Sequence, residues 1–139
     1  MASLSPDELY ARLQHFYARQ MQLLDAGRTQ EWADTFTEDG VFEAGVQAPV
    51  KGRDAIAVGA AAVAAKFTAD GITRRHWIGM ITIDPPGGDL AVRCYALVLE
   101  IASGGPVTVA RSTVCHDVLA PHGDLWQVRH RTVTRDDLP

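Results

Sequence analysis

The sequence predicts an α+β fold, in which a cone-shaped, curved antiparallel β-sheet wraps around three N-terminal helices and encloses a pocket. Helical patterns occupy the chain as far as Gly71. From Arg74 onward, strand-like runs alternate with short connections rich in Gly and Pro. A long sheet twists strongly, so it curls around helices that cover one face and leaves a cavity. The 139 residues are expected to form one domain over 1–139 with its own core.

Capping signals define the helices. Ser5-Pro6-Asp7-Glu8 combines an N-cap serine, a proline at the first helical position and a glutamate that completes a capping box. Apolar residues then recur at helical spacing until Gly27, the expected C′ residue. A second, short helix is expected from Thr29, and a third from Gly52 to Gly71.

Strand signals follow in the second half of the chain. A turn at Glu38-Asp39-Gly40 is expected to precede a short strand over 41–44. The longer strands are expected over 74–84, 89–102, 107–119 and 125–134. The connections at 84–88, 103–106 and 120–124 are short and rich in Gly and Pro, which predicts hairpins.

The composition of the chain argues against several classes of function. A net charge of −4 argues against a nucleic-acid or anionic-membrane partner. Cys94 and Cys115 form no zinc-type spacing and are expected to be buried free thiols, and the histidines have no metal-binding spacing. The N-terminal residues lack a signal-peptide pattern and no apolar run approaches membrane-spanning length. We therefore expect a bacterial cytoplasmic protein that uses no metal or cofactor.

One strand carries the main candidate for chemistry. The run from Arg74 to Ile83 contains His76, and strand alternation places Ile78 and Met80 on its face and Trp77 on the other. A histidine beside apolar residues is either a buried structural group or a proton-transfer group in a pocket. Both interpretations stay open at this stage.

Two carboxylates accompany this histidine. Asp25 lies in the last turn of the first helix, where the helix dipole disfavours an anion, so it is either a solvated end residue or is held for a partner. Glu100 stands between Leu99 and Ile101 and points either to solvent or into a pocket. An imidazole and a carboxylate across an apolar cavity can act as an acid–base pair. Asp25 would then fix the tautomer of His76 and strengthen it as a base.

Five segments occur in an order typical of a known family. They are Asp25-Ala26-Gly27, Trp32 with Phe36 and Glu38-Asp39-Gly40, Gly52-Arg53-Asp54-Ala55-Ile56, Arg75-His76-Trp77-Ile78-Gly79 and Trp126-Gln127-Val128-Arg129-His130-Arg131. In this order the sequence resembles the SnoaL-like branch of the nuclear transport factor 2-like superfamily, over nearly the whole chain. The resemblance implies a curved-sheet cone and often a homodimer formed through the sheet, with a trimer as the other possibility.

Within that branch, the sequence is most similar to the scytalone dehydratase, bile-acid dehydratase and polyketide cyclase group. The resemblance implies that His76, Asp25 and Glu100 are catalytic and that Thr113 and Cys115 form a polar pair on the following strand. Arg131 would hold a phenolate or carboxylate, or would be a solvated arginine. The residues expected to contact substrate are Tyr17, Phe42, Trp77, Met80, Thr113, Cys115 and Arg131.

The expected activity is that of a cofactor-independent dehydratase, cyclase or isomerase of secondary metabolism, such as antibiotic biosynthesis. The enzyme would remove a proton next to a carbonyl of a small polycyclic or polyketide-like substrate and deliver a proton to a leaving hydroxyl. The alternative is a non-catalytic ligand-binding or subunit-stabilising protein of the same fold, as in dioxygenase small subunits. The aromatic residues named above are either pocket lining or plain core.

Overall fold

One curved sheet covered by helices forms the molecule. The computed structural model describes residues 3–84 and 88–139. The helices are α1 (Pro6–Asp25), α2 (Thr29–Ala33) and α3 (Arg53–Ala69). The strands are β1 (Phe36–Ala44), β2 (Val50–Lys51), β3 (Ile72–Ile83), β4 (Leu90–Ala102), β5 (Val107–His122) and β6 (Leu125–Arg135). The expected α+β class and its curved sheet are confirmed.

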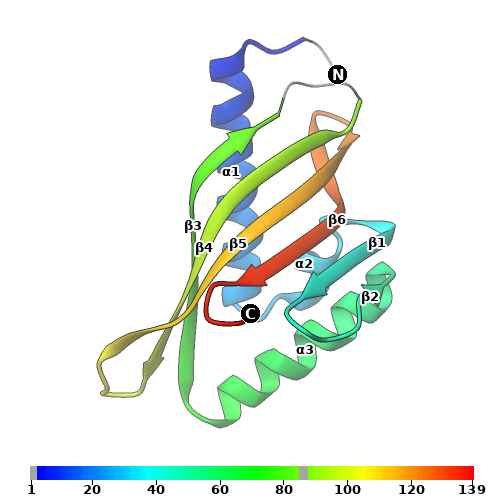
Figure 1. Cartoon of the computed structure of the whole chain (residues 1–139). Helices are drawn as coiled ribbons and strands as arrows, with labels where there is room; N and C mark the ends of the chain where they lie inside the picture. The colour runs from blue at the N-terminus through cyan, green and yellow to red at the C-terminus, as the bar shows by residue number, and fades with distance from the viewer. Residues whose placement is uncertain (1–2, 85–87) are drawn as a thin grey trace.

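The described strands form a single sheet in the order β2-β1-β6-β5-β4-β3. In Figure 1 this sheet faces the viewer, α1 and α2 lie behind it, and α3 crosses beyond its lower end. β3 is therefore an edge strand, and one row of its backbone groups has no partner strand. Within the described ranges, no helix is both long and apolar enough to cross a membrane.

The ends of α1 follow the predicted signals. The Ser5 hydroxyl accepts a hydrogen bond from the Glu8 backbone N–H, and the Ser5 N–H donates to the Glu8 carboxylate, which completes the capping box. Gly27 adopts φ +75°, the left-handed conformation that ends the helix after Asp25 and favours glycine. Asp25 is thus held in the last turn of α1.

β1 differs from the prediction. The turn expected at Glu38-Asp39-Gly40 lies inside β1, which begins at Phe36 and pairs in parallel with β6, with a register shift before Val41. A Cβ on Gly40 would lie 3.0 Å from the Thr37 carbonyl oxygen, so the close approach favours glycine. The short β2 was not expected. The hairpin predicted at 84–88 falls partly on residues 85–87, outside the described residues.

The core lies between the helices and the inner face of the sheet. Fully buried residues of α1, such as Leu13 and Tyr17, pack against the inner residues of β4 and β5, including Cys94 and Leu119. At this density a core residue is sensitive to the loss of a single methylene. α3 buries only Ile56 and Ala57 of its own residues, both in its N-terminal half. The C-terminal half of α3 is therefore less closely packed than α1.

Candidate functional site

His76 and Asp25 make a two-point contact. The Asp25 Oδ1 atom lies 2.6 Å from the ring Nδ1 of His76, and Oδ2 accepts a hydrogen bond of 3.1 Å from the His76 backbone N–H. This backbone group belongs to the edge strand β3, so the carboxylate at the end of α1 takes the place of a neighbouring strand. The contact expected between these two residues is present.

This contact defines the chemical state of the imidazole. A carboxylate only accepts hydrogen bonds, so Nδ1 carries the proton, and among the described residues Nε2 has no hydrogen-bond partner. The His76 side chain is 17% exposed and that of Asp25 is 9% exposed, so the pair is sheltered and the ring is still reachable from solvent. An imidazole held in this way can accept a proton at Nε2 and bear the resulting charge beside Asp25.

Glu100 shares the inner face of the sheet with His76. On β4, Val98 is opposite His76 and Glu100 is opposite Arg74, so Glu100 is one inward position further along the strand. Its Oε2 atom lies 3.5 Å from the Arg74 Nε atom, with both side chains mostly buried. The structure thus brings Asp25, His76 and Glu100 to one side of the sheet. Within this group, Asp25 contacts His76, and Glu100 contacts Arg74.

The polar pair on β5, Thr113 and Cys115, makes its contacts within the protein. Thr113 is buried, and its hydroxyl donates to the Ala96 carbonyl oxygen. Cys115 is buried directly opposite Cys94 in the β4–β5 register. The neighbouring Cys115 and burial raise the pKa of the Cys94 thiol well above its usual range, so Cys94 is a neutral thiol at physiological pH. The expected buried free thiols are confirmed.

Arg131 is neither a solvated arginine nor a free anion-binding group. Its guanidinium donates to both Asp117 oxygens at 2.9 and 2.8 Å and to the Gln20 amide oxygen at 2.7 Å, and its side chain is 4% exposed. The Tyr17 hydroxyl completes this cluster with a 2.7 Å hydrogen bond to Asp117. Burial lowers the pKa of Arg131, but the Asp117 carboxylate outweighs burial, and the net shift is upward. Tyr17 and Arg131 therefore join α1 to β5 and β6 through hydrogen bonds within the core.

The buried Tyr17 hydroxyl should make the free energy of unfolding fall at alkaline pH. Burial, followed by the Asp117 charge, raises the pKa of its hydroxyl well above the ordinary value. The unfolded chain then loses this proton first, so the free energy of unfolding falls as pH rises above about 10, by up to about 1.4 kcal/mol per pH unit. Urea unfolding between pH 8 and 11 should show this slope and Tyr17→Phe should flatten it. Tyr95→Phe, at an exposed tyrosine, should leave the slope as it is.

β-bulges change the faces on which Met80 and Arg129 lie. The β3–β4 register shifts between Gly79 and Thr82, and Met80 adopts φ +53° and is 76% exposed. The expectation that Met80 shares the face of His76 is wrong, because the extra residue inverts the alternation. The β5–β6 register shifts in the same way around Arg129, which turns outward to Asp89 and away from the face of Arg131. Simple alternation would place Arg129 and Arg131 on one face of β6, and the register shift places them on opposite faces.

The structure places two aromatic candidates, Trp77 and Phe42, in different surroundings. Trp77 is on the outer face of β3 and is 68% exposed. Phe42 packs edge-on against Trp32 and Phe36 within the core. Trp77 therefore lies on the face opposite His76, and the Phe42 ring belongs to the core. Their sequence signal, an aromatic residue within a strand, is equally typical of core and of interface.

Sequence reasoning missed Arg74, Asp117 and Gln20. The position of Asp117 beside His116 assigns it to the face opposite that histidine, and the structure places it there, but its buried partner Arg131 could not be read from the sequence. Arg74 carried a usable signal, because strand alternation places it on the face of His76.

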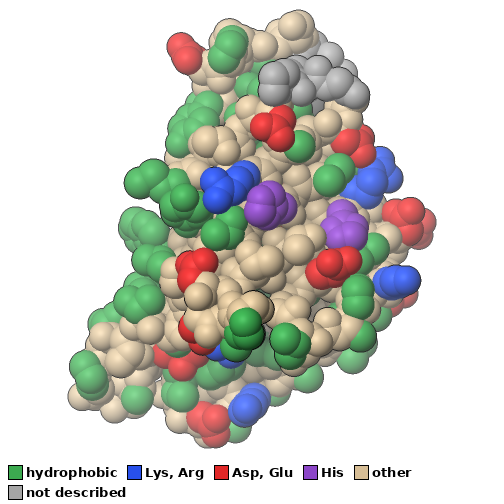
Figure 2. Space-filling view, in the orientation of Figure 1, with side chains coloured by type: hydrophobic (Ala, Val, Ile, Leu, Met, Phe, Trp, Pro, Cys, Tyr) green, Lys and Arg blue, Asp and Glu red, His purple; other side chains and the backbone are tan. Residues whose placement is uncertain are grey.

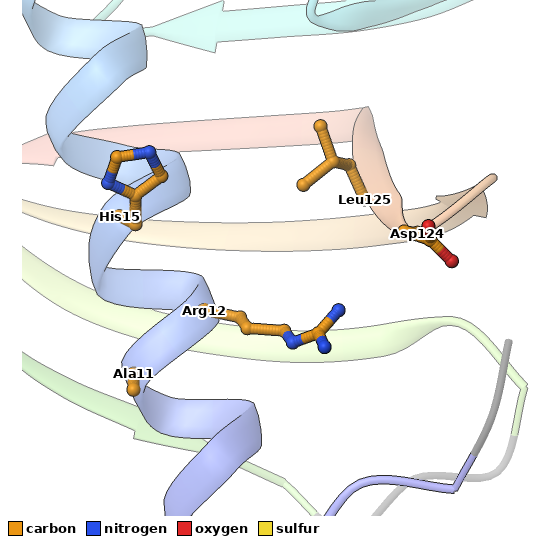
Figure 3. Close-up of a pocket in the computed structure, with 5 residues that line it drawn as sticks. All are labelled: Ala11, Arg12, His15, Asp124 and Leu125. Carbon is orange, nitrogen blue, oxygen red and sulfur yellow. The ribbon is translucent and has the colours of Figure 1, made fainter.

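The surface also carries shallow hollows. In Figure 3, Arg12 and His15 of α1 face Asp124 of the β5–β6 turn and Leu125 of β6 across one of these hollows. His15 is ten residues before Asp25, or about 15 Å along the helix axis, so this hollow is separate from the His76–Asp25 pair. Among residues 3–84 and 88–139, no group of three or more His, Cys, Asp or Glu side chains is placed to hold a metal ion.

The fold and this pair define a class: curved-sheet α+β proteins with a histidine–carboxylate pair on the inner face of the sheet. The SnoaL-like domain family matches residues 8–132. The chain therefore belongs to the SnoaL-like family, a cyclase- and dehydratase-type family of secondary metabolism within the nuclear transport factor 2-like superfamily.

Three solved structures illustrate the similarity. ActVI-ORFA from Streptomyces coelicolor is 33% identical with a TM-score of 0.89, covering 96% of this chain and 99% of that one. Aln2 from another Streptomyces species is 32% identical with a TM-score of 0.87, covering 96% and 94%. A Catenulispora acidiphila protein in complex with S-DNPA is 36% identical with a TM-score of 0.82, covering 93% and 94%. No curated protein is significantly similar in sequence.

Proposed function

We propose that the protein is a cofactor-independent dehydratase, cyclase or isomerase that acts on a small polycyclic or polyketide-like carbonyl compound. The observation that carries the proposal is the two-point contact of Asp25 with His76, which leaves a basic Nε2 on the inner face of the sheet. A structural histidine buried in a core would have both ring nitrogens bonded. Here Asp25 holds one nitrogen and the ring keeps contact with solvent.

The residues support a simple proton-transfer sequence. His76 Nε2 takes a proton from the carbon next to the substrate carbonyl, and the electron pair of the broken C–H bond moves to the carbonyl oxygen as an enolate. Asp25 stabilises the imidazolium that forms. Return of the proton to a leaving hydroxyl releases water, which is dehydration, and return to another carbon is isomerisation. Attack of the enolate carbon on an internal carbonyl is aldol cyclisation.

Glu100 is the second acid–base candidate of this proposal. It projects from the same face as His76 and is separated from it by one inward position of the strand register. Ile78 follows His76 on the inner face and supplies apolar surface, and the Phe67 ring lies further along beside Arg74. The Catenulispora relative forms a complex with S-DNPA, a small molecule, which supports a small-molecule substrate for this chain.

The direct test is an assay for conversion. Purified protein is incubated with aromatic polyketide intermediates that carry a β-hydroxy carbonyl group, and products are followed by liquid chromatography with mass detection. Dehydration loses the mass of water, whereas isomerisation changes retention without a change in mass. If the protein binds these compounds and converts none, the binding-protein alternative replaces the enzyme.

We also propose a homodimer formed through the outer face of the sheet. Apolar side chains of β3, β4 and β5 are exposed there, among them Trp77 opposite Leu97, and Tyr95. Figure 2 shows this face, with hydrophobic side chains gathered over β3 and β4. An exposed apolar patch on a sheet is typical of an interaction surface.

Trp77→Glu should convert the dimer to a monomer. A charge in the centre of an apolar contact is desolvated without a partner, which weakens association by orders of magnitude. Sedimentation velocity over a range of protein concentrations measures the change. Val58→Glu, at a 70% exposed valine of α3, is the control and should leave the assembly unchanged. A wild-type protein that is monomeric throughout the range would contradict the dimer.

A further inference from the structure

Arg74 is an arginine with unmet hydrogen-bonding capacity next to His76. Its side chain is 18% exposed, and its Nε–H is buried without a hydrogen-bond partner among the described residues. The guanidinium carbon lies 4.3 Å from the centre of the Phe67 ring, over its face, which is a cation–π contact. The nearest carboxylate oxygen, on Glu100, is 3.5 Å from Nε, beyond a strong charge-assisted hydrogen bond.

The contacts of Arg74 differ from those of a structural ion pair. The buried Arg131 shows what such a pair looks like in this protein, with three hydrogen bonds of 2.7 to 2.9 Å to Asp117 and Gln20. Burial, with the nearby charge of Arg111, lowers the pKa of Arg74, although Glu100 opposes this. A mostly buried cation with an unsatisfied donor is unfavourable unless a further acceptor binds there.

The position of Arg74 relative to His76 suits one particular acceptor. Residues i and i+2 of a strand lie on the same face, and their Cα atoms are about 6.6 Å apart along the strand. One small carbonyl compound can therefore place its α-carbon at His76 Nε2 and its carbonyl oxygen at the Arg74 guanidinium. Proton removal by His76 moves negative charge onto that oxygen, and a preorganised cation stabilises such charge as it develops.

We propose that Arg74 binds the substrate carbonyl oxygen and stabilises the enolate that forms when His76 removes the α-proton. This assignment rests on the proposed function and adds to it the electrophilic group of the site. Glu100 is the counter-ion of Arg74 in the free protein, and the substrate oxygen supplies the hydrogen-bond acceptor that Glu100 does not. The preferred ligands are flat compounds whose carbonyl oxygen carries negative charge.

The assignment is tested by binding a matched pair of probes at pH 7.5. The first is 2-hydroxy-1,4-naphthoquinone, which is an enolate anion at this pH, and the second is the neutral 2-methoxy-1,4-naphthoquinone with the same ring system. Calorimetric titration measures both. Arg74→Gln should weaken binding of the anion about tenfold or more and leave the neutral probe within about twofold. Glu100→Gln should tighten binding of the anion, because it removes the competing carboxylate.

The chain offers a matched control. Arg75 is the next residue of β3 and points to the opposite, outer face, so Arg75→Gln removes the same charge without touching the site. It should leave the affinity for both probes unchanged. In turnover, Arg74→Gln should lower kcat more than it raises KM, because the enolate charge is greatest in the transition state.

Each other outcome overturns the assignment in a distinct way. If Arg74→Gln binds the anion as tightly as wild type, the assignment is wrong and the proposed function stands. If this variant loses both probes equally, Arg74 only shapes the site. If wild type binds neither probe, the flat polycyclic ligand class of the proposed function is wrong, and the role of Arg74 is lost with it.

Discussion

Replacing His76 with glutamine is expected to lower kcat by about 10²- to 10⁴-fold, the range that a general base contributes. Glutamine keeps a polar side chain of similar length, but it cannot accept a proton at neutral pH. The Asp25 contact to the backbone N–H of residue 76 does not depend on the side chain, so β3 should stay attached to the end of α1. The measurement is steady-state turnover of the substrate identified in the conversion assay.

Two variants make this result specific. His116→Gln removes an exposed histidine from β5 and should retain wild-type turnover. Asp25→Asn should also lower kcat, because an amide does not stabilise the imidazolium as a carboxylate does. A His76→Gln protein that turns over substrate normally would refute His76 as the base.

Replacing Asp117 with alanine is expected to lower the free energy of unfolding by about 3–5 kcal/mol, the usual effect of breaking a buried ion pair. The substitution leaves the Arg131 charge buried and removes the acceptor of the Tyr17 hydroxyl. The Asp117 side chain is 1% exposed, so water cannot easily replace the lost carboxylate. Urea unfolding followed by circular dichroism measures the loss.

A second Asp–Arg pair of the same sheet supplies the control. Asp89 binds Arg129 at 2.7 Å, but the two side chains are 33% and 48% exposed. Asp89→Ala should therefore cost less than about 1 kcal/mol. Equal losses for the two variants would show that burial of the Asp117–Arg131 pair is not what makes it important.

The Asp117 cluster also connects stability to the site. Through Tyr17 and Gln20 it fixes α1 against β5 and β6, and α1 ends at Asp25. The carboxylate that orients His76 is thus positioned by the same helix that the buried cluster anchors. An Asp117 variant that still folds should therefore lose part of its turnover at temperatures well below its unfolding transition.

Much of this protein could be predicted from local sequence signals. The capping box at Ser5, Gly27 and the Gly- and Pro-rich connections define where α1 ends and where hairpins form, because each signal acts within a few residues. His76 and Asp25 were identified because a histidine in an apolar strand and a carboxylate at a helix C-terminus are each unfavourable without a partner. Their 2.6 Å contact supplies that partner.

Only the tertiary structure decided how distant residues combine. Alternation failed at Met80 and at Arg129, because a bulge depends on the partner strand and leaves no clear local pattern. The bond between Tyr17 and Asp117 joins residues 100 positions apart. The sequence by itself determined where α1 begins and ends, which segments form strands, and that His76 and Asp25 would each need a partner. Which partner each obtained depended on the curvature and register of the sheet, since these bring distant segments together.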